Sequence, residues 1–215
     1  MTRWEPGARE RLAAAALELF VEQGFAATTV PQITERAGLT TRTFFRHFTD
    51  KREVLFGAED HLPAVVDAQM AQAPVGMDPM QLIEIGLREV ANEQFDGLHD
   101  YLRTRRAIVR SDSGLREREL RKSLILAEAA TKGFRDRGED ELTATLAAHI
   151  SVTAFDIAID RWLDQDDPLA LPDIVSETLV ALRSITTSLT TVAPEAAPAG
   201  RTSNERRIPI ERVIP

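Results

Sequence analysis

The chain has 215 residues, enough for one or two domains with a sizeable core, and 43% of its residues are hydrophobic. It contains no cysteine, which excludes disulfides and thiolate metal sites, and no uninterrupted apolar run approaches the roughly 18 residues of a membrane span. The net charge of −8 excludes a surface that attracts polyanions everywhere, although residues 1–52 carry a net +2 and the rest carries −10. Because the polar start of the chain is not typical of a signal peptide, we expect a cytoplasmic protein.

The first predicted helix covers residues 7–23. Its apolar side chains follow the spacing of one helical face, and Gly24 is typical of a residue that ends a helix. We expect this helix to brace the segment that follows it. The apolar face consists of Leu12, Ala15, Ala16, Leu19 and Phe20.

The pattern of residues 28–51 predicts two short helices joined by a tight turn. Thr29 can cap the first helix, with Gln32 as the return partner of a capping box, and Pro31 lies in the first turn, where a missing N–H costs nothing. Gly38 favours a left-handed stop, and Thr40 can cap a second helix that runs from about residue 41 to residue 47. This order is typical of the helix-turn-helix motif.

The second helix of this motif presents a polar face. Phe44 and Phe48 are four residues apart and can pack inward. The outward side chains then suit base edges in a DNA major groove, and the polar residues around them suit phosphates. The alternative is a small helical hairpin whose polar face only meets water. The predicted base contacts are Thr41, Arg42, Phe45 and Arg46, and the predicted phosphate contacts are Thr28, Thr29, Thr40, Thr43, His47 and Lys51.

The segment resembles the DNA-binding region of the TetR family of bacterial repressors, whose pattern is roughly T-x-x-x-I-A-x-x-A-G-V-S-x-x-T-L-Y-x-H-F-x-x-K. The resemblance covers residues 8 to about 56. Phe45 replaces the usual tyrosine, so a hydroxyl that could reach DNA is missing, and Thr34 replaces a usual alanine. The matching positions are Thr29, Ile33, Ala37, Gly38, Leu39, Thr40, Thr43, Phe44, Phe45, His47, Phe48 and Lys51.

The rest of the chain is also predicted to be helical, which gives an all-α protein with about nine helices. A fourth helix should run from Lys51 towards Ala73, kinked or interrupted by Pro63. The resemblance implies that this helix connects a three-helix DNA-binding unit to a larger ligand-binding and dimerisation domain. We therefore expect a DNA-binding domain over residues 1–50, a helical domain over residues 51–192, and a flexible Pro-, Ala- and charge-rich tail over residues 193–215.

The larger domain offers candidates for a ligand pocket. Arg105 belongs to a basic run that either forms a solvated face or points one arginine at an anionic group in a cavity. His149, on an apolar helix, is either a pocket residue or a satisfied core histidine. The run R-T-F-F-R-H-F-x-D-K resembles one branch of the family, which implies a small effector that is hydrophobic or acyl-CoA-like. The predicted lining is Tyr101, Leu102, Arg105, Ile108, Phe134, His149, Phe155, Ile159 and Trp162.

The helix predicted over residues 140–164 has two apolar stripes, so both of its sides should be buried. One side can face its own domain and the other a second copy of the chain, as in the dimers that the resemblance implies. The alternative is that a single chain buries both sides. Together with a last helix over about residues 173–191, this predicts dimer contacts by Ile150, Ile157, Leu179 and Leu182.

The sequence holds no pattern of enzyme chemistry. Its four histidines lack metal-ligand spacing, and no nucleophile elbow, phosphate-binding glycine loop or dinucleotide fingerprint occurs. We therefore expect no enzyme activity, no metal and no cofactor. The leading hypothesis is a ligand-responsive repressor that binds a palindromic DNA operator as a homodimer and is released by its effector. The alternative is a helical sensor or scaffold that acts through protein partners.

Overall fold

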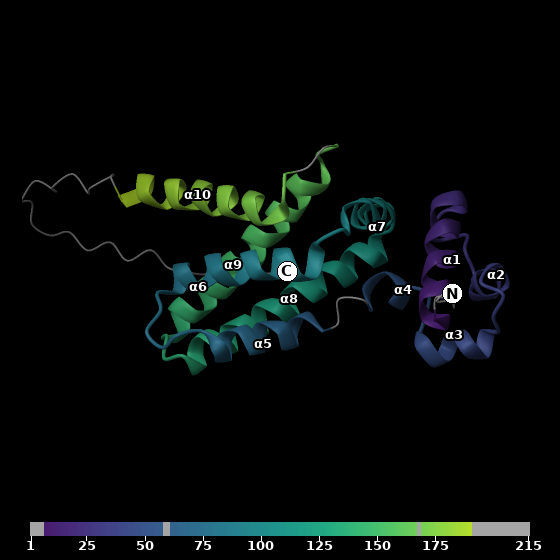
Figure 1. Cartoon of the computed structure of the whole chain (residues 1–215), viewed down its shortest axis with the longest axis horizontal. Helices are drawn as coiled ribbons and strands as arrows, with labels where there is room; N and C mark the ends of the chain where they lie inside the picture. Colours follow the sequence, from purple (N-terminus) through teal and green to yellow (C-terminus); the bar gives the residue numbers. More distant parts are fainter. Residues whose placement is uncertain (1–6, 58–60, 167–168, 191–215) are drawn as a thin grey trace, which may run out of the picture.

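The computed structural model describes residues 7–57, 61–166 and 169–190, so the predicted tail over residues 193–215 lies outside the described part. The described residues form ten helices and no strand, which confirms the all-α prediction (Figure 1). The helices are α1 Ala8–Gln23, α2 Val30–Arg36, α3 Thr41–His47, α4 Glu53–Phe56, α5 Leu62–Gln72, α6 Pro79–Phe95, α7 His99–Ser111, α8 Ser113–Asp136, α9 Glu141–Leu163 and α10 Leu171–Thr190.

Helices α1 to α4 form a unit at one end of the molecule, called the head below (Figure 1). Its core is a continuous cluster of buried side chains in which phenylalanine is prominent. Ile108 and Val109 of α7 and Leu115 of α8 belong to the same cluster, so the head packs directly on the rest of the molecule. The head's own members include Leu12, Leu19, Phe20, Phe25, Ile33, Phe44, Phe48, Leu55 and Phe56.

The predicted fourth helix is interrupted rather than continuous. It forms the short α4, which ends at Gly57, and α5, which begins at Leu62; residues 58–60 between them lie outside the described part. Pro63 lies in the first turn of α5, where a backbone N–H would have no partner within the helix. The interruption accounts for ten helices where the sequence predicts about nine.

Helices α5 to α10 form the larger unit, called the body below, with α9 near its centre (Figure 1). α9 packs against α6, α7, α8 and α10, and α5 packs on α8. The face of α9 that meets its neighbours is made of small residues, which allow helices to approach closely. Its buried small residues are Ala144, Ala147, Ala148, Ser151, Ala154 and Ala158.

By length and composition alone, α9 is able to cross a membrane, with a mean hydropathy of 1.5 over 18 residues. The apolar run is interrupted, because Asp156 and Asp160 lie within the helix. Its packing against four other helices gives the apolar composition a different explanation, namely a core position in a helical body.

Candidate nucleic-acid interface and helical-domain cavities

Side chains at the junction of α1 and α2 hold the helix-turn-helix in place. Arg11 donates from Nη2 to the carbonyl oxygen of Ala37 at 2.5 Å. Arg36 donates to both carboxylate oxygens of Glu22 at 2.8 and 2.7 Å and lies 3.3 Å from a carboxylate oxygen of Glu18. The hydrogen bond from Arg36 lowers the pKa of Glu22. Because these pairs lie in solvent, they contribute little free energy, and their main effect is to orient α2 on α1.

The turn between α2 and α3 has the geometry that its glycine predicts. Gly38 has φ 63°, in the left-handed region. Its N–H donates to the carbonyl oxygen of Glu35 at 3.0 Å, and the N–H of Leu39 donates to that of Thr34 at 2.8 Å. This pair of bonds is the Schellman arrangement, which satisfies the carbonyls at the end of a helix. It sets the direction in which α3 leaves the turn.

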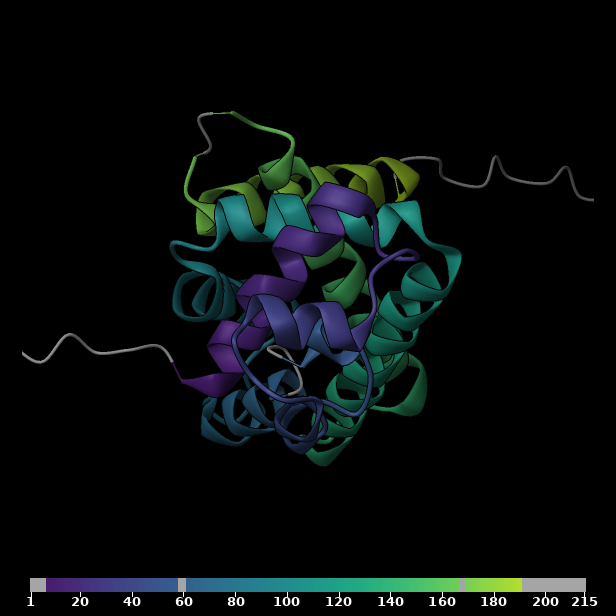
Figure 2. The same ribbon diagram turned by 90° about the vertical axis from the view of Figure 1, so that its right-hand side faces the viewer.

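α3 is anchored by one face and exposed on the other. Phe44 is fully buried, and its ring lies 5.4 Å from that of Phe48. Phe45 packs its edge against Phe44 but leaves 56% of its surface exposed. Figure 2 views the molecule from the head end, with α1, α2 and α3 in front of the body. The exposed face of α3 carries the four predicted base contacts, Thr41, Arg42, Phe45 and Arg46.

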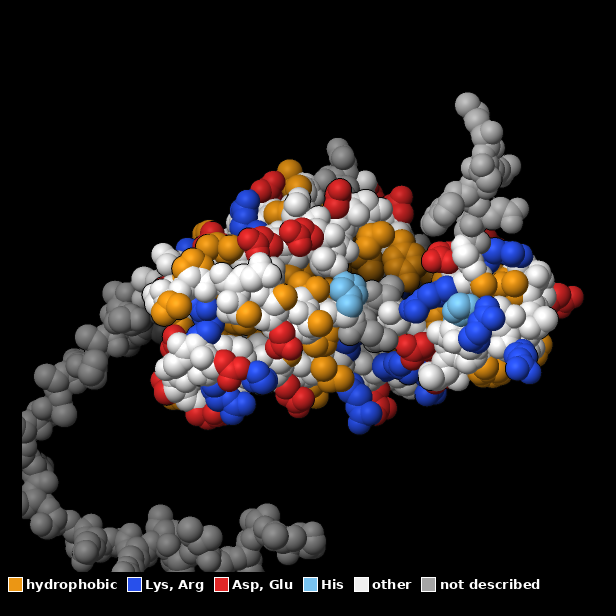
Figure 3. Space-filling model, turned by 60° about the horizontal axis from the view of Figure 1, so that its bottom comes forward, with side chains coloured by type: hydrophobic (Ala, Val, Ile, Leu, Met, Phe, Trp, Pro, Cys, Tyr) orange, Lys and Arg blue, Asp and Glu red, His pale blue; other side chains and the backbone are white. Residues whose placement is uncertain are grey.

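The predicted phosphate contacts surround this face, and two of them cap helices. The backbone N–H of Thr29 donates to Oε1 of Gln32 at 2.8 Å, as the capping-box pattern predicts. Thr40 accepts a hydrogen bond from the backbone N–H of Thr43 at 3.1 Å, and their hydroxyls lie 2.9 Å apart. Thr29 and Thr40 are exposed, whereas Thr43 and His47 are half-buried. Figure 3 shows Lys and Arg side chains on the surface of the head.

Thr28 does not have the role that the sequence predicted. Only 1% of its surface is exposed, and its hydroxyl donates to the carbonyl oxygen of Gly24 at 2.8 Å, just after α1. The side chain therefore satisfies a backbone carbonyl group in the connection between α1 and α2. A buried hydroxyl that points inward cannot reach a phosphate.

Lys51 also requires a correction. Its ammonium donates to the carbonyl oxygens of Phe25 at 2.7 Å and Thr28 at 2.8 Å, with Ala26 at 3.4 Å, and it lies 4.3 Å from the centre of the Phe25 ring. Burial lowers its pKa. The three donors are thus directed at the connection between α1 and α2, so that Lys51 supports the head instead of offering donors to DNA.

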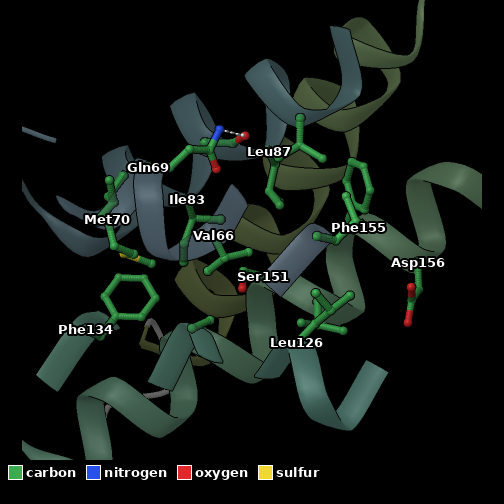
Figure 4. A pocket seen from close by; sticks show the side chains of 16 residues that line it. Val66, Gln69, Met70, Ile83, Leu87, Leu126, Phe134, Ser151, Phe155 and Asp156 are labelled. Atoms are coloured by element: carbon green, nitrogen blue, oxygen red, sulfur yellow. Dashed lines mark hydrogen bonds between the residues drawn. The ribbon is translucent and has the colours of Figure 1, made fainter. Parts of the chain in front are cut away.

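The body contains an apolar cavity of about 100 Å³ between α5, α6, α8 and α9, called the apolar cavity below. Figure 4 shows Phe134, Phe155, Met70 and Leu87 around it. The sequence predicted only Phe134 and Phe155 of this wall. The sequence did contain a signal for part of the remaining wall, because apolar residues three or four apart along α5 and α6 share a helical face. These residues are Val66, Met70, Ile83, Leu87 and Val90.

A second cavity of about 260 Å³ lies beside the first and shares Phe155 with it; it is called the mixed cavity below. Besides Phe155, three residues from the predicted lining, Leu102, Arg105 and Ile159, lie in its wall. The remaining wall includes charged side chains from α7, α8 and α9. These are Arg106, Arg110, Glu119, Lys122, Asp156 and Asp160.

Four residues of the predicted pocket line neither of these two cavities. Ile108 is buried in the core of the head, because α7 packs on the head. Trp162 is buried in the core of the body, where its ring meets His99 edge-on at 4.8 Å. Tyr101 is half-buried against the same core, and burial raises its pKa. His149 is exposed, so both alternatives considered for it were wrong.

Arg105 connects the body to α4. Its side chain is 7% exposed, and Nε donates to the carbonyl oxygen of Leu55 at 2.7 Å while Nη1 donates to Glu119 at 2.8 Å. Its guanidinium also lies 4.8 Å from the centre of the Phe56 ring. The anionic partner is therefore a carboxylate of α8, and Arg105 is not part of a solvated face.

Arg118 of α8 makes a second connection to α4. It donates to Glu53 at 2.7 Å, and its guanidinium lies 5.4 Å from the centre of the Phe56 ring. Two arginines from the body, Arg105 and Arg118, thus contact the side chain or backbone of every residue of α4 except Val54. Because α4 has only four residues, a movement of α7 or α8 would change the position of α4 in the head.

The outward face of the body exposes apolar side chains on α9 and α10. Ile157, a predicted dimer contact, is 48% exposed, and Ile150 is half-buried. Leu179 is 1% exposed inside the core of the body, and Leu182 packs partly against that core, so Leu179 is not available to a second chain. The other exposed apolar residues of these helices include Leu142, Leu146, Val180 and Ile185.

Comparison with known proteins identifies the helix-turn-helix. The model of the bacterial regulatory proteins of the tetR family matches residues 12–58, which include α2, α3 and α4. Residues 12–58 thus form a DNA-binding region of the TetR type. The TetR resemblance predicted from the motif is thus confirmed.

Two curated relatives are transcriptional regulators. TcmR of Streptomyces glaucescens is 38% identical over 89 residues, which are 41% of this chain and 39% of that protein. The activator FasR of Mycolicibacterium smegmatis is 25% identical over 177 residues, which are 80% of this chain and 79% of that protein. Both are named as HTH-type transcriptional regulators, which favours the DNA-binding hypothesis over the scaffold alternative.

The fold is shared with a solved TetR-family repressor. FadR of Thermus thermophilus, in complex with lauroyl-CoA, has a TM-score of 0.54 and 21% identity, with 90% of this chain and 100% of that chain covered. At this identity the likeness concerns the fold, which in this chain comprises an N-terminal helix-turn-helix and a helical body.

Proposed function

We propose that the chain is a homodimeric, ligand-responsive regulator of transcription that acts in the cytoplasm. The observation that carries the proposal is the outward face of α3, a short helix held by a buried aromatic residue and presenting two arginines, a threonine and an exposed aromatic ring. Such a helix suits the major groove, where each base pair offers its own pattern of donors, acceptors and methyl groups. The family match over the same residues supports this function.

The exposed residues of the head divide into two roles. Arg42 can donate two hydrogen bonds to a guanine, and Phe45 can pack on the methyl group of a thymine. Thr41 and Arg46 complete the base contacts on the same face. Phosphate contacts position the helix without reading sequence, and in this proposal they come from Thr29, Thr40, Thr43 and His47.

The apolar faces of α9 and α10 support dimerisation. Leu142 and Leu146 of α9 are 68% and 53% exposed, and Val180 and Ile185 of α10 are 60% and 63% exposed. A second copy of the chain would cover these exposed apolar side chains in a two-fold interface of four helices. Two copies of α3 would then read the halves of a palindromic operator.

The apolar cavity is the proposed effector site. Its wall is almost entirely hydrophobic, which suits a small hydrophobic molecule, and it would hold the acyl chain of an acyl-CoA only after the surrounding helices move apart. The complex of FadR with lauroyl-CoA supports the second choice. Effector binding would change the packing of α5 to α9, and Arg105 and Arg118 would carry the change to α4. The effector releases the operator only if it binds the two dimer shapes with different affinities.

Competition binding with every operator position varied tests the DNA contacts. Arg42→Ala should cost about 1–3 kcal/mol and relax the preference at one position in each half-site. Arg135→Ala is the matched control, because it removes an exposed arginine from the far end of α8. If both variants bound every sequence like the parent protein, α3 would not be the reading helix.

Sedimentation of the purified chain tests the dimer. Leu146→Asp should shift a dimer towards the 23.9 kDa monomer, because a charge would be buried in the interface. Val75→Asp, at a fully exposed site between α5 and α6, should leave the dimer unchanged. A parent protein that sediments only as the monomer at micromolar concentration would contradict the proposal.

A thermal-shift screen of fatty acyl-CoAs, aromatic compounds and other metabolites tests the effector site. A true effector should raise the melting temperature, because it binds the folded state, and should lower operator affinity. A compound that raises the melting temperature but leaves operator affinity unchanged is a ligand without the proposed regulatory effect.

A further inference from the structure

A third cavity lies at the joint between the head and the body, and the proposed function does not use it. Its volume is about 510 Å³, and it lies between the start of α4 and the first half of α8. We call it the joint cavity. Figure 3 shows basic side chains near this joint as well as on the head. The lining consists of four cationic residues, Arg52, Arg118, Arg121 and Lys122, together with Phe56, Gly114, Glu117 and Ile125.

The cationic side chains of the joint cavity differ in whether they form ion pairs with carboxylates. Arg118 pairs with Glu53 at 2.7 Å and lies 3.9 Å from Asp50. Arg52 and Arg121 are exposed, and neither side chain forms an ion pair with any other residue that the structure describes. The N–H donors of their guanidinium groups are therefore available to a ligand, and the planar arrangement of these donors matches the oxygens of a phosphate.

The beginning of α8 favours an anion at the same place. Gly114 is the second residue of this 24-residue helix, and a Cβ there would lie 3.6 Å from Nη2 of Arg52. Nη2 of Arg52 thus lies near the first turn of α8, where helix N–H groups create a positive potential. Asp112 offsets part of this potential, because it accepts a hydrogen bond from the N–H of Leu115 at 3.0 Å.

We infer that the joint cavity binds a small phosphate-bearing anion between Arg52 at the start of α4 and Arg121 of α8. Arg118 already pairs with Glu53, and burial lowers the pKa of Lys122 to about 7, so Arg52 and Arg121 are the cations of the wall that a compact phosphate-bearing anion would meet. The inference does not depend on the effector site, because the joint cavity shares no residue with the apolar cavity.

Binding at this place would link the head to the body. Phe56 lines the joint cavity, and its ring also contacts the guanidinium groups of Arg105 and Arg118. A phosphate held by Arg52 and Arg121 would add contacts across the same joint and stabilise one arrangement of α4 on α8. If that arrangement differs in its affinity for DNA, the anion and DNA affect each other's binding by the same factor.

Titration calorimetry of the full chain with inorganic pyrophosphate at low salt tests the inference. Arg52→Gln and Arg121→Gln should each weaken binding about tenfold, since each removes one charge-assisted contact. Arg116→Gln is the matched control, because Arg116 is an exposed arginine of α8 outside the wall. All three sites are exposed, so unchanged melting temperatures should show that the variants fold. No detectable binding of pyrophosphate, or an equal loss in Arg116→Gln, overturns the inference.

The phosphates of DNA are another source of the same chemistry, and a second titration separates the two. Pyrophosphate is added to the protein already bound to a DNA duplex. If it binds the complex with an affinity that still depends on Arg52 and Arg121, a small-molecule site is supported. If it competes with the duplex and both variants lose affinity for DNA, the joint cavity holds a backbone phosphate and the small-molecule inference is overturned.

Discussion

The head and the body of this protein are packed with different kinds of side chain. In the head, large rings meet closely: the rings of Phe20 and Phe25 lie 5.1 Å apart, and those of Phe44 and Phe48 lie 5.4 Å apart. In the body, the central helix α9 buries mostly alanine, and the apolar and mixed cavities lie beside it. Large rings therefore fill the core of the head, whereas cavities remain beside the small side chains of α9 in the body.

This difference relates packing to the two proposed tasks. A helix that reads base edges must hold its side chains in one position, and dense aromatic packing under α3 provides that rigidity. A ligand site requires apolar surface that the folded chain leaves partly unfilled, because the ligand gains free energy by covering it. Removal of volume should therefore be costly in the head, whereas added volume should be tolerated in the body where it points into the apolar cavity.

The largest effect is expected for Phe44→Ala in the head. This ring is fully buried at the base of α3, and its removal should destabilise the head by about 3–5 kcal/mol, from lost burial and the cavity left behind. Chemical denaturation followed by circular dichroism measures it. Phe45→Ala is the control, since that ring is 56% exposed and should matter mainly for DNA binding. Equal destabilisation by both variants would show that α3 is not anchored as described.

A smaller loss of about 1–3 kcal/mol is expected for Lys51→Met, because the carbonyl oxygens of Phe25 and Thr28 would lose their donor. Urea unfolding measures it. The salt dependence of DNA binding should keep its slope, since the ammonium is directed into the head. A slope flatter by about one unit would instead show that Lys51 contacts a phosphate, as the motif predicts.

In the body, Gly133→Ala should destabilise by about 1 kcal/mol, because a Cβ on α8 would lie 2.6 Å from Cγ of Met70 on α5. Thermal unfolding measures the change. Met70→Ala in the same background should relieve the clash. If the double variant lost as much stability as the two single variants added together, close contact between α5 and α8 at this point would be contradicted.

The smallest effect, and one of opposite sign, is expected for Gly86→Ala. Gly86 lies within α6 on the wall of the apolar cavity, and an added Cβ meets only the amide of Gln69 at 3.5 Å. Alanine favours a helix over glycine, so stability should rise by about 0.5–1 kcal/mol. The same methyl group narrows the cavity, and any effector found by thermal shift should bind more weakly. A loss of stability would show that the cavity wall is already filled at this point.

The sequence was a good guide wherever the deciding contacts are local. Gly38, the capping threonines and the inward spacing of Phe44 and Phe48 predict the helix-turn-helix, because helix caps and helical faces depend on residues within about four positions. The same reasoning predicts from Pro63 a kink or an interruption of the long fourth helix, and α5 begins one residue before that proline. The exposed face of α3 follows from these features before any tertiary contact is considered.

Where the deciding contacts are distant in the chain, the sequence was a poor guide. Lys51 binds carbonyls 23 and 26 residues away, and Arg105 binds a carbonyl 50 residues away, so no local pattern distinguishes them from a phosphate contact or a pocket residue. Leu179 and Ile157 both fit an apolar stripe, yet only the packing of α10 on α6 and α9 buries the first and leaves the second exposed. The sequence by itself thus determined most of the helices, their caps and the exposed face of α3. The tertiary structure alone decided which apolar and charged side chains face a core, a cavity or a partner, because periodicity gives a residue's face on its helix and not the neighbour of that face.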